Sequence, residues 1–245
     1  MQPKRVLPID INYILVEYEQ IISKKINLKV IQLTKSIEKN EIEGIKSIIP
    51  TYSSLLIEYD PSINTVEKML ETITNLANNL EDESENSKSR LVKIPVLYGG
   101  DFGPDLTEVA RINNLNEHEV IEIHKSNIYR VYMLGFNPGY PYMGGLDKRI
   151  ATPRLDEPRT KVPAGSVAIG GEQTGIYSIT SPGGWRLIGH TPLEMFNPEE
   201  DDPTLLRAGD EVMFYEVSLK DYEQIKKDIN DGMYKVNIEL VDIDE

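Results

Sequence analysis

The chain has 245 residues, of which 40% are hydrophobic and 27% are charged, a composition that supports a folded globular protein and excludes a chain disordered throughout. Its formal net charge of -14 argues against nucleic acid and anionic membranes as partners, because both attract basic surfaces. The chain has no cysteine, which excludes disulfides, thiolate nucleophiles and cysteine metal sites and agrees with a reducing compartment.

The start of the chain and its apolar runs bear on its location. No stretch approaches the roughly 18 consecutive apolar residues that a membrane span needs. Residues 1–5 lead into a strand-like segment rather than into the apolar core of a signal peptide. We therefore expect a cytoplasmic protein whose partners are small molecules or other proteins.

The first 80 residues alternate between strand and helix patterns. Residues 5–18 predict two extended runs with a turn between them, and residues 45–49 and 54–59 predict a hairpin. Apolar residues three and four apart predict two helices, the second opened by Pro61 and Ser62. These residues are Ile22, Ile26, Val30, Leu33 and Ile37 in the first helix, and Val66, Met69, Leu70, Ile73, Leu76 and Leu80 in the second.

A closing strand at residues 91–98 would make these elements a ferredoxin-like domain, which we expect over residues 1–90. Residues 81–90 (EDESENSKSR) contain no apolar residue and predict a flexible loop before the next domain. The sequence therefore predicts a domain boundary near residue 90.

Glycine dominates the next part of the chain, because 14 of the 17 glycines fall between Gly99 and Gly189. Asn116 and Glu119 have capping-box spacing, and Ser218 and Asp221 are placed to cap a helix that ends near residue 230. Short strand-like runs separated by Pro and Gly turns predict a sandwich or barrel over residues 91–245. These runs are residues 129–135, 162–169, 175–180, 185–189, 211–217 and 234–240.

Familiar catalytic motifs are missing. Residues 170–175 have the glycine spacing of a P-loop, but Ile176 stands where a lysine is needed to reach phosphates. His118 and His124 are six residues apart and not four, so we expect no zinc site on that helix. Ser166 lies in AGSVAIG rather than in a nucleophile elbow and is not predicted to attack a substrate.

Three segments carry candidate binding residues. Residues 134–146 bring together Phe136, Tyr140 and Tyr142, either as a pocket wall or as a buried aromatic corner of the barrel. Residues 147–161 have an excess of positive charge, and their arginines either bind a carboxylate or phosphate or form a solvated loop. Residues 181–192 hold Trp185, Arg186 and His190, where Trp185 is either a core anchor or a site residue and His190 suits an acid, a base or a hydrogen-bond donor.

Five segments resemble a known family: YGGDFGPDL (98–106), YRVYMLGFNPGYPYMGGLD (129–147), ATPR (151–154), PRTKVPAGSVAIGGEQTGIYSITSPGGWRLIGHTP (158–192) and RAGDEVMF (207–214). They are similar to the allophanate hydrolase subunit 1 family, which includes the B-type component of 5-oxoprolinase and an inhibitor of sporulation kinase A. The resemblance implies a ferredoxin-like domain followed by a cyclophilin-like barrel, and hence an α+β fold.

The resemblance also implies a function. It implies one component of an ATP-dependent 5-oxoprolinase, which opens 5-oxo-L-proline to L-glutamate and is inactive without its partners. Those partners are a second cyclophilin-like protein, the C-type subunit of 5-oxoprolinase, and an A-type subunit of the lactam-utilisation kind, and ATP is bound at the level of the complex. The alternative is a regulatory protein that inhibits a sporulation-type histidine kinase.

The charged segment and the family-like spacing together define a candidate site. We expect Arg154 and Arg159 to face one pocket with Tyr142, Gln173, Trp185 and His190, and we expect no metal ion there. The catalytic candidates are His190 and Arg159, and the substrate-binding candidates are Arg154, Tyr142, Phe136, Gln173, Trp185, Arg186 and Ser166.

Overall fold

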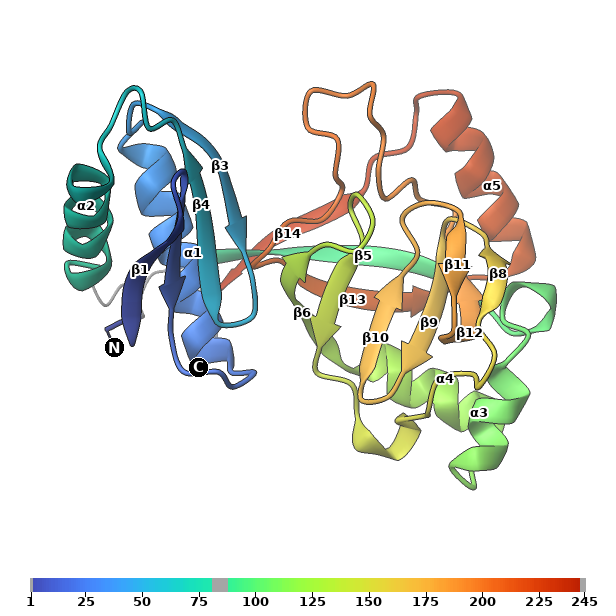
Figure 1. Ribbon diagram of the computed structural model, residues 1–245. Helices are drawn as coiled ribbons and strands as arrows, with labels where there is room; N and C mark the ends of the chain where they lie inside the picture. Colours follow the sequence, from blue (N-terminus) through green and yellow to red (C-terminus); the bar gives the residue numbers. More distant parts are fainter. Residues whose placement is uncertain (1, 81–87, 243–245) are drawn as a thin grey trace. The chain divides into compact units, whose positions relative to one another are not determined.

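The computed structural model describes residues 2–80 and 88–242, and the chain forms two compact units (Figure 1). One unit comprises Met1–Lys88 with Asp242–Glu245, and the other comprises Ser89–Val241. Residues 81–87, most of the predicted flexible loop, lie outside the described residues. Residues 88–90 of that predicted loop are instead the start of a strand.

The first unit is a four-stranded antiparallel sheet with two helices packed against it. The sheet has the order β1-β2-β4-β3. Alternate residues of the central strands β2 and β4, such as Ile14, Val16, Leu55 and Ile57, are buried and form a core with the helices. The elements are β1 (Arg5–Asp10), β2 (Tyr13–Glu17), α1 (Lys24–Lys39), β3 (Ile45–Pro50), β4 (Ser54–Tyr59) and α2 (Val66–Asn78).

Three predictions for this unit were wrong in detail. Residues 91–98 do not close the first sheet, because they belong to a strand of the second unit, and the edge position beside β2 is taken by β1. Helix α2 begins at Val66, where the Thr65 side chain accepts a hydrogen bond from the backbone N–H of Lys68, rather than at residues 61–62. Ile22 precedes α1 and is 65% exposed, so it does not belong to the buried stripe of that helix.

The second unit contains a closed barrel of seven strands, which agrees with the predicted α+β fold and cyclophilin-like barrel. The strands run in the order β12-β9-β10-β7-β6-β13-β5, and β5 pairs with β12 to close the ring. They are β5 (Lys88–Tyr98), β6 (Ile128–Leu134), β7 (Pro141–Gly144), β9 (Ser166–Gly170), β10 (Gln173–Ile176), β12 (Arg186–His190) and β13 (Glu211–Glu216).

The remaining elements surround this barrel (Figure 1). Helices α3 (Leu106–Ile112) and α4 (Glu117–Ser126) lie beside each other, and α5 (Leu219–Asn230) leads to β14 (Asn237–Asp242), which extends the sheet at β5. Strands β8 (Arg159–Val162) and β11 (Ser181–Gly183) form a separate two-stranded sheet. The short 3-10 helices η2 (Gly100–Phe102) and η3 (Lys148–Ile150) lie in the connections.

The two helix caps predicted for this unit are confirmed. The predicted capping box at the start of α4 is present, and the Ser218 side chain accepts a hydrogen bond from the backbone N–H of Asp221 at the start of α5. The predicted single strand at residues 162–169 was wrong, since it divides into β8 and β9. The division falls at Gly165, whose φ of +85° favours glycine.

His124 on α4 is fully buried in the barrel core. Its Nε2 lies 2.9 Å from the Thr174 hydroxyl, which itself donates to the Ala168 carbonyl, so Nε2 carries the proton and donates. Its Nδ1 then accepts from the Tyr98 hydroxyl at 2.8 Å. Burial lowers the pKa of His124 from 6.5 to about 3, so the ring is neutral.

Across residues 2–80 and 88–242, none of the helices is both long enough and apolar enough to cross a membrane.

Candidate functional site

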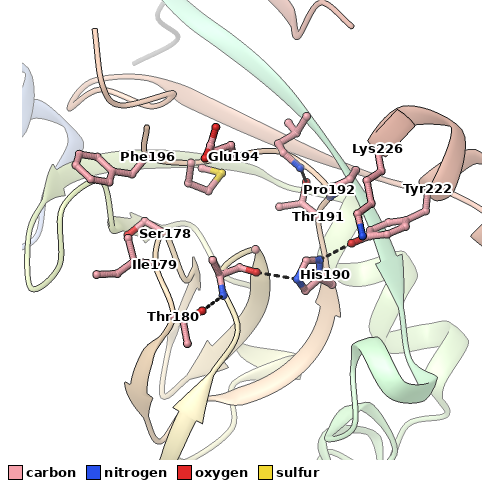
Figure 2. Close-up of a pocket in the computed structure, with 14 residues that line it drawn as sticks. Ser178, Ile179, Thr180, His190, Thr191, Pro192, Glu194, Phe196, Tyr222 and Lys226 are labelled. Carbon is pink, nitrogen blue, oxygen red and sulfur yellow. Dashed lines mark hydrogen bonds between the residues drawn. The ribbon is translucent and has the colours of Figure 1, made fainter. Parts of the chain in front are cut away.

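A cavity of about 440 Å³ opens at the carboxyl end of β12 (Figure 2). Its walls come from the turn that precedes β9, the segment after β10, the segment after β12 and one face of α5. The volume suits a small organic molecule. The lining residues are Ala164, Gly165, Ser178, Ile179, Thr180, His190, Thr191, Pro192, Leu193, Glu194, Met195, Phe196, Tyr222 and Lys226.

His190, the last residue of β12, is hydrogen-bonded through both ring nitrogens. Nε2 lies 2.8 Å from the Ala164 carbonyl oxygen, which can only accept, so Nε2 carries the proton. Nδ1 then accepts from the Tyr222 hydroxyl at 2.9 Å. Burial is the main cause that lowers the pKa of His190, and the nearby ammonium of Lys226 also lowers it. His190 is therefore a neutral side chain whose orientation is set by α5 and by the turn at Ala164.

The turn at Gly165 brings the backbone against this imidazole. A Cβ at Gly165 would lie 2.5 Å from His190 Cε1 and 2.6 Å from the Thr191 carbonyl oxygen. The absence of a side chain therefore allows His190 to occupy its position in the cavity wall.

A second cluster of candidate site residues surrounds Trp185, which immediately precedes β12. Trp185 is 5% exposed and packs with Tyr140, Tyr177 and Leu187. Arg154 places its guanidinium carbon 5.5 Å from the centre of the Trp185 ring, a cation–π geometry. Within the described part of the chain, no carboxylate forms an ion pair with the exposed Arg154. Trp185 is thus both a core residue and a platform for a cation.

Aromatic side chains continue from Trp185 toward the surface. The Tyr140 ring lies edge-on to the rings of Trp185, Tyr142 and Phe136, with centroid distances of 6.0, 5.3 and 6.0 Å. Phe136 is 70% exposed and has a φ of 65°, an unfavourable conformation for a bulky residue. Tyr140 therefore belongs to a buried aromatic corner of the barrel, and a pocket wall at residues 134–146 stays a prediction.

Arg159, at the start of β8, is held by an acidic residue that was not predicted from the sequence. Its Nη2 donates to Asp105 Oδ1 at 2.8 Å, and the other carboxylate oxygen of Asp105 accepts from the backbone N–H of Leu187 at 2.7 Å. Asp105 therefore ties Arg159 to β12. A single aspartate gives no sequence signal for a contact with a side chain 54 residues away.

The other candidate site residues differ in burial and in their contacts. Ser166 is 2% exposed and pairs with His190 across β9 and β12. Arg186 donates to the Pro153 carbonyl at 3.2 Å, and Gln173 is half-buried at the start of β10. Of the candidate site residues, only His190 lines the cavity. One pocket that includes His190, Arg154 and Arg159 together stays a prediction.

The two histidines considered for zinc lie in different surroundings. His118 is on the surface within 3.6 Å of Glu122, whereas His124 is in the barrel core. Among residues 2–80 and 88–242, no group of three or more His, Cys, Asp or Glu side chains is arranged to hold a metal ion.

Comparisons with known proteins place these features in a family. The 5-oxoprolinase B subunit of Bacillus subtilis (strain 168) is 45% identical over 229 residues, which cover 88% of this chain and 94% of that protein. The 5-oxoprolinase B subunit of Escherichia coli O157:H7 is 47% identical over 168 residues, which cover 65% of this chain and 77% of that protein.

Solved structures extend the likeness to the fold. The crystal structure of TTHA0988 superposes with a TM-score of 0.75 at 34% identity, over 84% of this chain but only 40% of that one. This chain therefore spans less than half of TTHA0988. The Kluyveromyces lactis urea carboxylase superposes with a TM-score of 0.73 at 26% identity, over 98% of this chain and 25% of that one.

The family match covers most of both units. A sequence model described as carboxyltransferase domain, subdomain C and D, matches residues 4–206. That match and the two 5-oxoprolinase relatives agree with the resemblance to the allophanate hydrolase subunit 1 family. The chain belongs to the carboxyltransferase subdomain C and D family.

Proposed function

We propose that this chain is the B-type subunit of an ATP-dependent 5-oxoprolinase, acting on 5-oxo-L-proline in a cytoplasmic complex. The observation that carries the proposal is the 45% identity to the 5-oxoprolinase B subunit of Bacillus subtilis over 94% of that protein's length. Likeness over nearly a whole relative favours the same role more strongly than likeness of fold alone.

The reaction explains why partners are needed. A lactam is an unreactive amide, and ATP supplies a phosphoryl group that activates its oxygen. Water then adds to the activated carbon, the ring carbon–nitrogen bond breaks to give an acyl phosphate, and a second water displaces phosphate to give L-glutamate. We propose that a second cyclophilin-like protein of the C type and an A-type protein of the lactam-utilisation kind complete the site, and that this chain is inactive alone.

The relation to larger enzymes supports a complex. The urea amidolyase of Saccharomyces cerevisiae is 28% identical over 93% of this chain, yet the match covers only 14% of that enzyme. A related segment therefore occurs there as one part of a much longer catalytic chain. This agrees with a module that works beside other domains or subunits.

We further propose that the first unit is a ferredoxin-like domain, with a domain boundary near residue 90. Its order β1-β2-β4-β3 is that of a ferredoxin-like sheet if β1 takes the place of the fourth strand. The fourth strand would then come from the start of the domain instead of its end.

The functional test is reconstitution of the complex. The chain is purified alone and together with the A-type and C-type subunits, and 5-oxoproline-dependent release of phosphate from ATP is measured. We expect turnover only in the complete mixture. Robust turnover by the chain alone would contradict the proposed dependence on partners, and an inactive complete mixture would contradict the proposed enzyme.

We propose that Arg154, whose guanidinium lies over the Trp185 ring, contacts either the carboxylate of the substrate or the transferred phosphoryl group. Asp105 orients Arg159. His190 is retained as the proposed acid–base residue, which requires release of its contact to Tyr222 or to Ala164. Phe136, Tyr142, Gln173, Arg186 and Ser166 remain the proposed surroundings of the substrate.

Replacing Arg154 by Ala is expected to slow the assembled enzyme about tenfold or more, because a charge-assisted contact of about 1.5–3 kcal/mol is lost. The measurement is kcat/KM of the complex for 5-oxoproline. Arg149→Ala is the matched control, because Arg149 is exposed and pairs with Asp147 instead of an aromatic ring. Equal kinetics of the Arg154→Ala and wild-type complexes would remove Arg154 from the site.

A further inference from the structure

The loop that joins β6 to β7, residues 135–140, presents an aromatic side chain to solvent. Of the four phenylalanines in the chain, only Phe136 is exposed, with 70% of its surface accessible. Its φ of 65° is a value that bulky residues rarely adopt. An exposed ring and a strained backbone thus occur at one residue. Neither feature stabilises the folded chain, which points to a function in binding.

Hydrogen bonds hold this loop in a defined conformation. The backbone N–H of Gly135 donates to the Tyr140 carbonyl at 3.1 Å, and that of Tyr140 donates to the Asn137 carbonyl at 3.1 Å. The Ser178 hydroxyl donates to the Pro138 carbonyl at 2.6 Å and so ties the loop to the segment after β10. The exposed ring is therefore held in place before any partner arrives, which lowers the entropy cost of binding.

An acidic segment lies beside this loop. Residues 194–202 contain five carboxylates and no basic residue, and Glu199 and Glu200 are both exposed. The loop and the segment are in contact, because a Cβ at Gly139 would lie only 3.0 Å from Phe196 Cβ. Figure 1 shows the two side by side at one end of the barrel. The surface next to the exposed ring is therefore negatively charged.

We infer that Phe136 and residues 194–202 form a docking face for a partner protein that presents an apolar pocket with lysine and arginine at its rim. An aromatic anchor with charged residues around it is a common arrangement in protein interfaces. A second copy of this chain does not fit through the same face, because like charges would meet. The inference rests on the proposed function in one respect, that the partner is another subunit of the proposed complex.

The test is a calorimetric titration of the full chain with the purified A-type subunit and, separately, with the C-type subunit. We expect one of them to bind, and we expect Phe136→Ala to weaken that binding at least about tenfold. Phe136→Gly should weaken it equally, yet unfold at a higher urea concentration than Phe136→Ala, because glycine tolerates a φ of 65°. Equal losses of binding in two variants of different stability would come from the missing ring and not from a damaged fold.

Ile128→Ala is the matched apolar control, because Ile128 is 50% exposed at the opposite end of β6 and should not affect binding.

The acidic part of the face has its own variant. Replacing both Glu199 and Glu200 by Gln should weaken binding about threefold or more and reduce its dependence on salt, because the basic rim loses its partners. Replacing Glu38 and Glu43 by Gln removes the same charge from exposed positions in the first unit and should leave binding as in the wild type.

Three results would overturn the inference. They are no binding of either subunit by the wild type, wild-type affinity of Phe136→Ala, and unchanged affinity and salt dependence after both glutamates are replaced. A mixture that hydrolyses ATP with 5-oxoproline while Phe136→Ala binds normally would refute the docking face alone. Binding through this face in a complete mixture without turnover would refute the proposed enzyme alone.

Discussion

The Asp105→Ala variant is expected to lose about 3 kcal/mol of unfolding free energy. The Asp105 side chain is 10% exposed and pairs with Arg159, which is 30% exposed. Its loss would leave the backbone N–H of the buried Leu187 without the 2.7 Å contact that Asp105 provides. Arg159 would be hydrated again in part. Most of the loss in unfolding free energy therefore comes from the unpaired N–H of Leu187 and from the lost connection between Arg159 and β12.

Urea unfolding followed by fluorescence of Trp185, the only tryptophan, reports directly on this region. Glu108→Ala is the matched control because it breaks an exposed Glu–Arg pair on α3, and it should leave the unfolding free energy close to that of the wild type. A double-mutant cycle of Asp105→Asn and Arg159→Gln measures the coupling between the two side chains. An Asp105→Ala variant as stable as the control would show that the contact contributes little.

Acid is expected to destabilise the barrel unit through His124. Burial lowers the pKa of His124 from 6.5 to about 3, so as the pH falls the unfolded chain takes up the proton first. The contribution of His124 is therefore complete above about pH 6.5 and falls by at most about 1.4 kcal/mol for each pH unit down to about pH 3. The lowered pKa of His190 acts in the same direction.

The measurement compares the urea unfolding free energy of the wild type at about pH 7 and about pH 5, where His124 alone accounts for about 2 kcal/mol of loss. His124→Gln should be less stable at neutral pH, because it disturbs the contacts to Tyr98 and Thr174, and should show a weaker dependence on pH. His118→Gln, on the exposed face of α4, should keep the wild-type dependence. An unchanged dependence in His124→Gln would assign the acid sensitivity to other groups.

The starts of two helices in the second unit could be predicted from the sequence because helix caps use local chemistry, whereas the barrel was implied by the family resemblance. The Asn116–Glu119 capping box and the Ser218 cap each act within four residues, so their spacing alone specifies them. The order of strands in the first sheet could not be predicted this way. Whether β1 or residues 91–98 pairs with β2 depends on contacts between distant segments, and both segments are apolar enough to form a strand.

The candidate site was predicted less completely for the same reason. Composition indicated the segments around Phe136, Arg154 and His190, but each role depends on a partner far along the chain. Arg159 is held by Asp105, 54 residues away, and His190 is held by Tyr222, 32 residues away. Lys226 lies on a helix whose amphipathic pattern is ordinary, so only the structure shows that it faces the cavity.

The position of β1 at the edge of the first sheet has a consequence during synthesis on the ribosome. All four strands of that sheet lie within residues 5–59, so every pairing partner is available before the second unit has emerged. The barrel has no such advantage, since β5 pairs with β12 and β13, and Ser89 bonds to the Gly209 carbonyl 120 residues later. The first unit can therefore fold early, whereas β5 stays unpaired, as a target for chaperones or aggregation, until nearly the whole chain has been made.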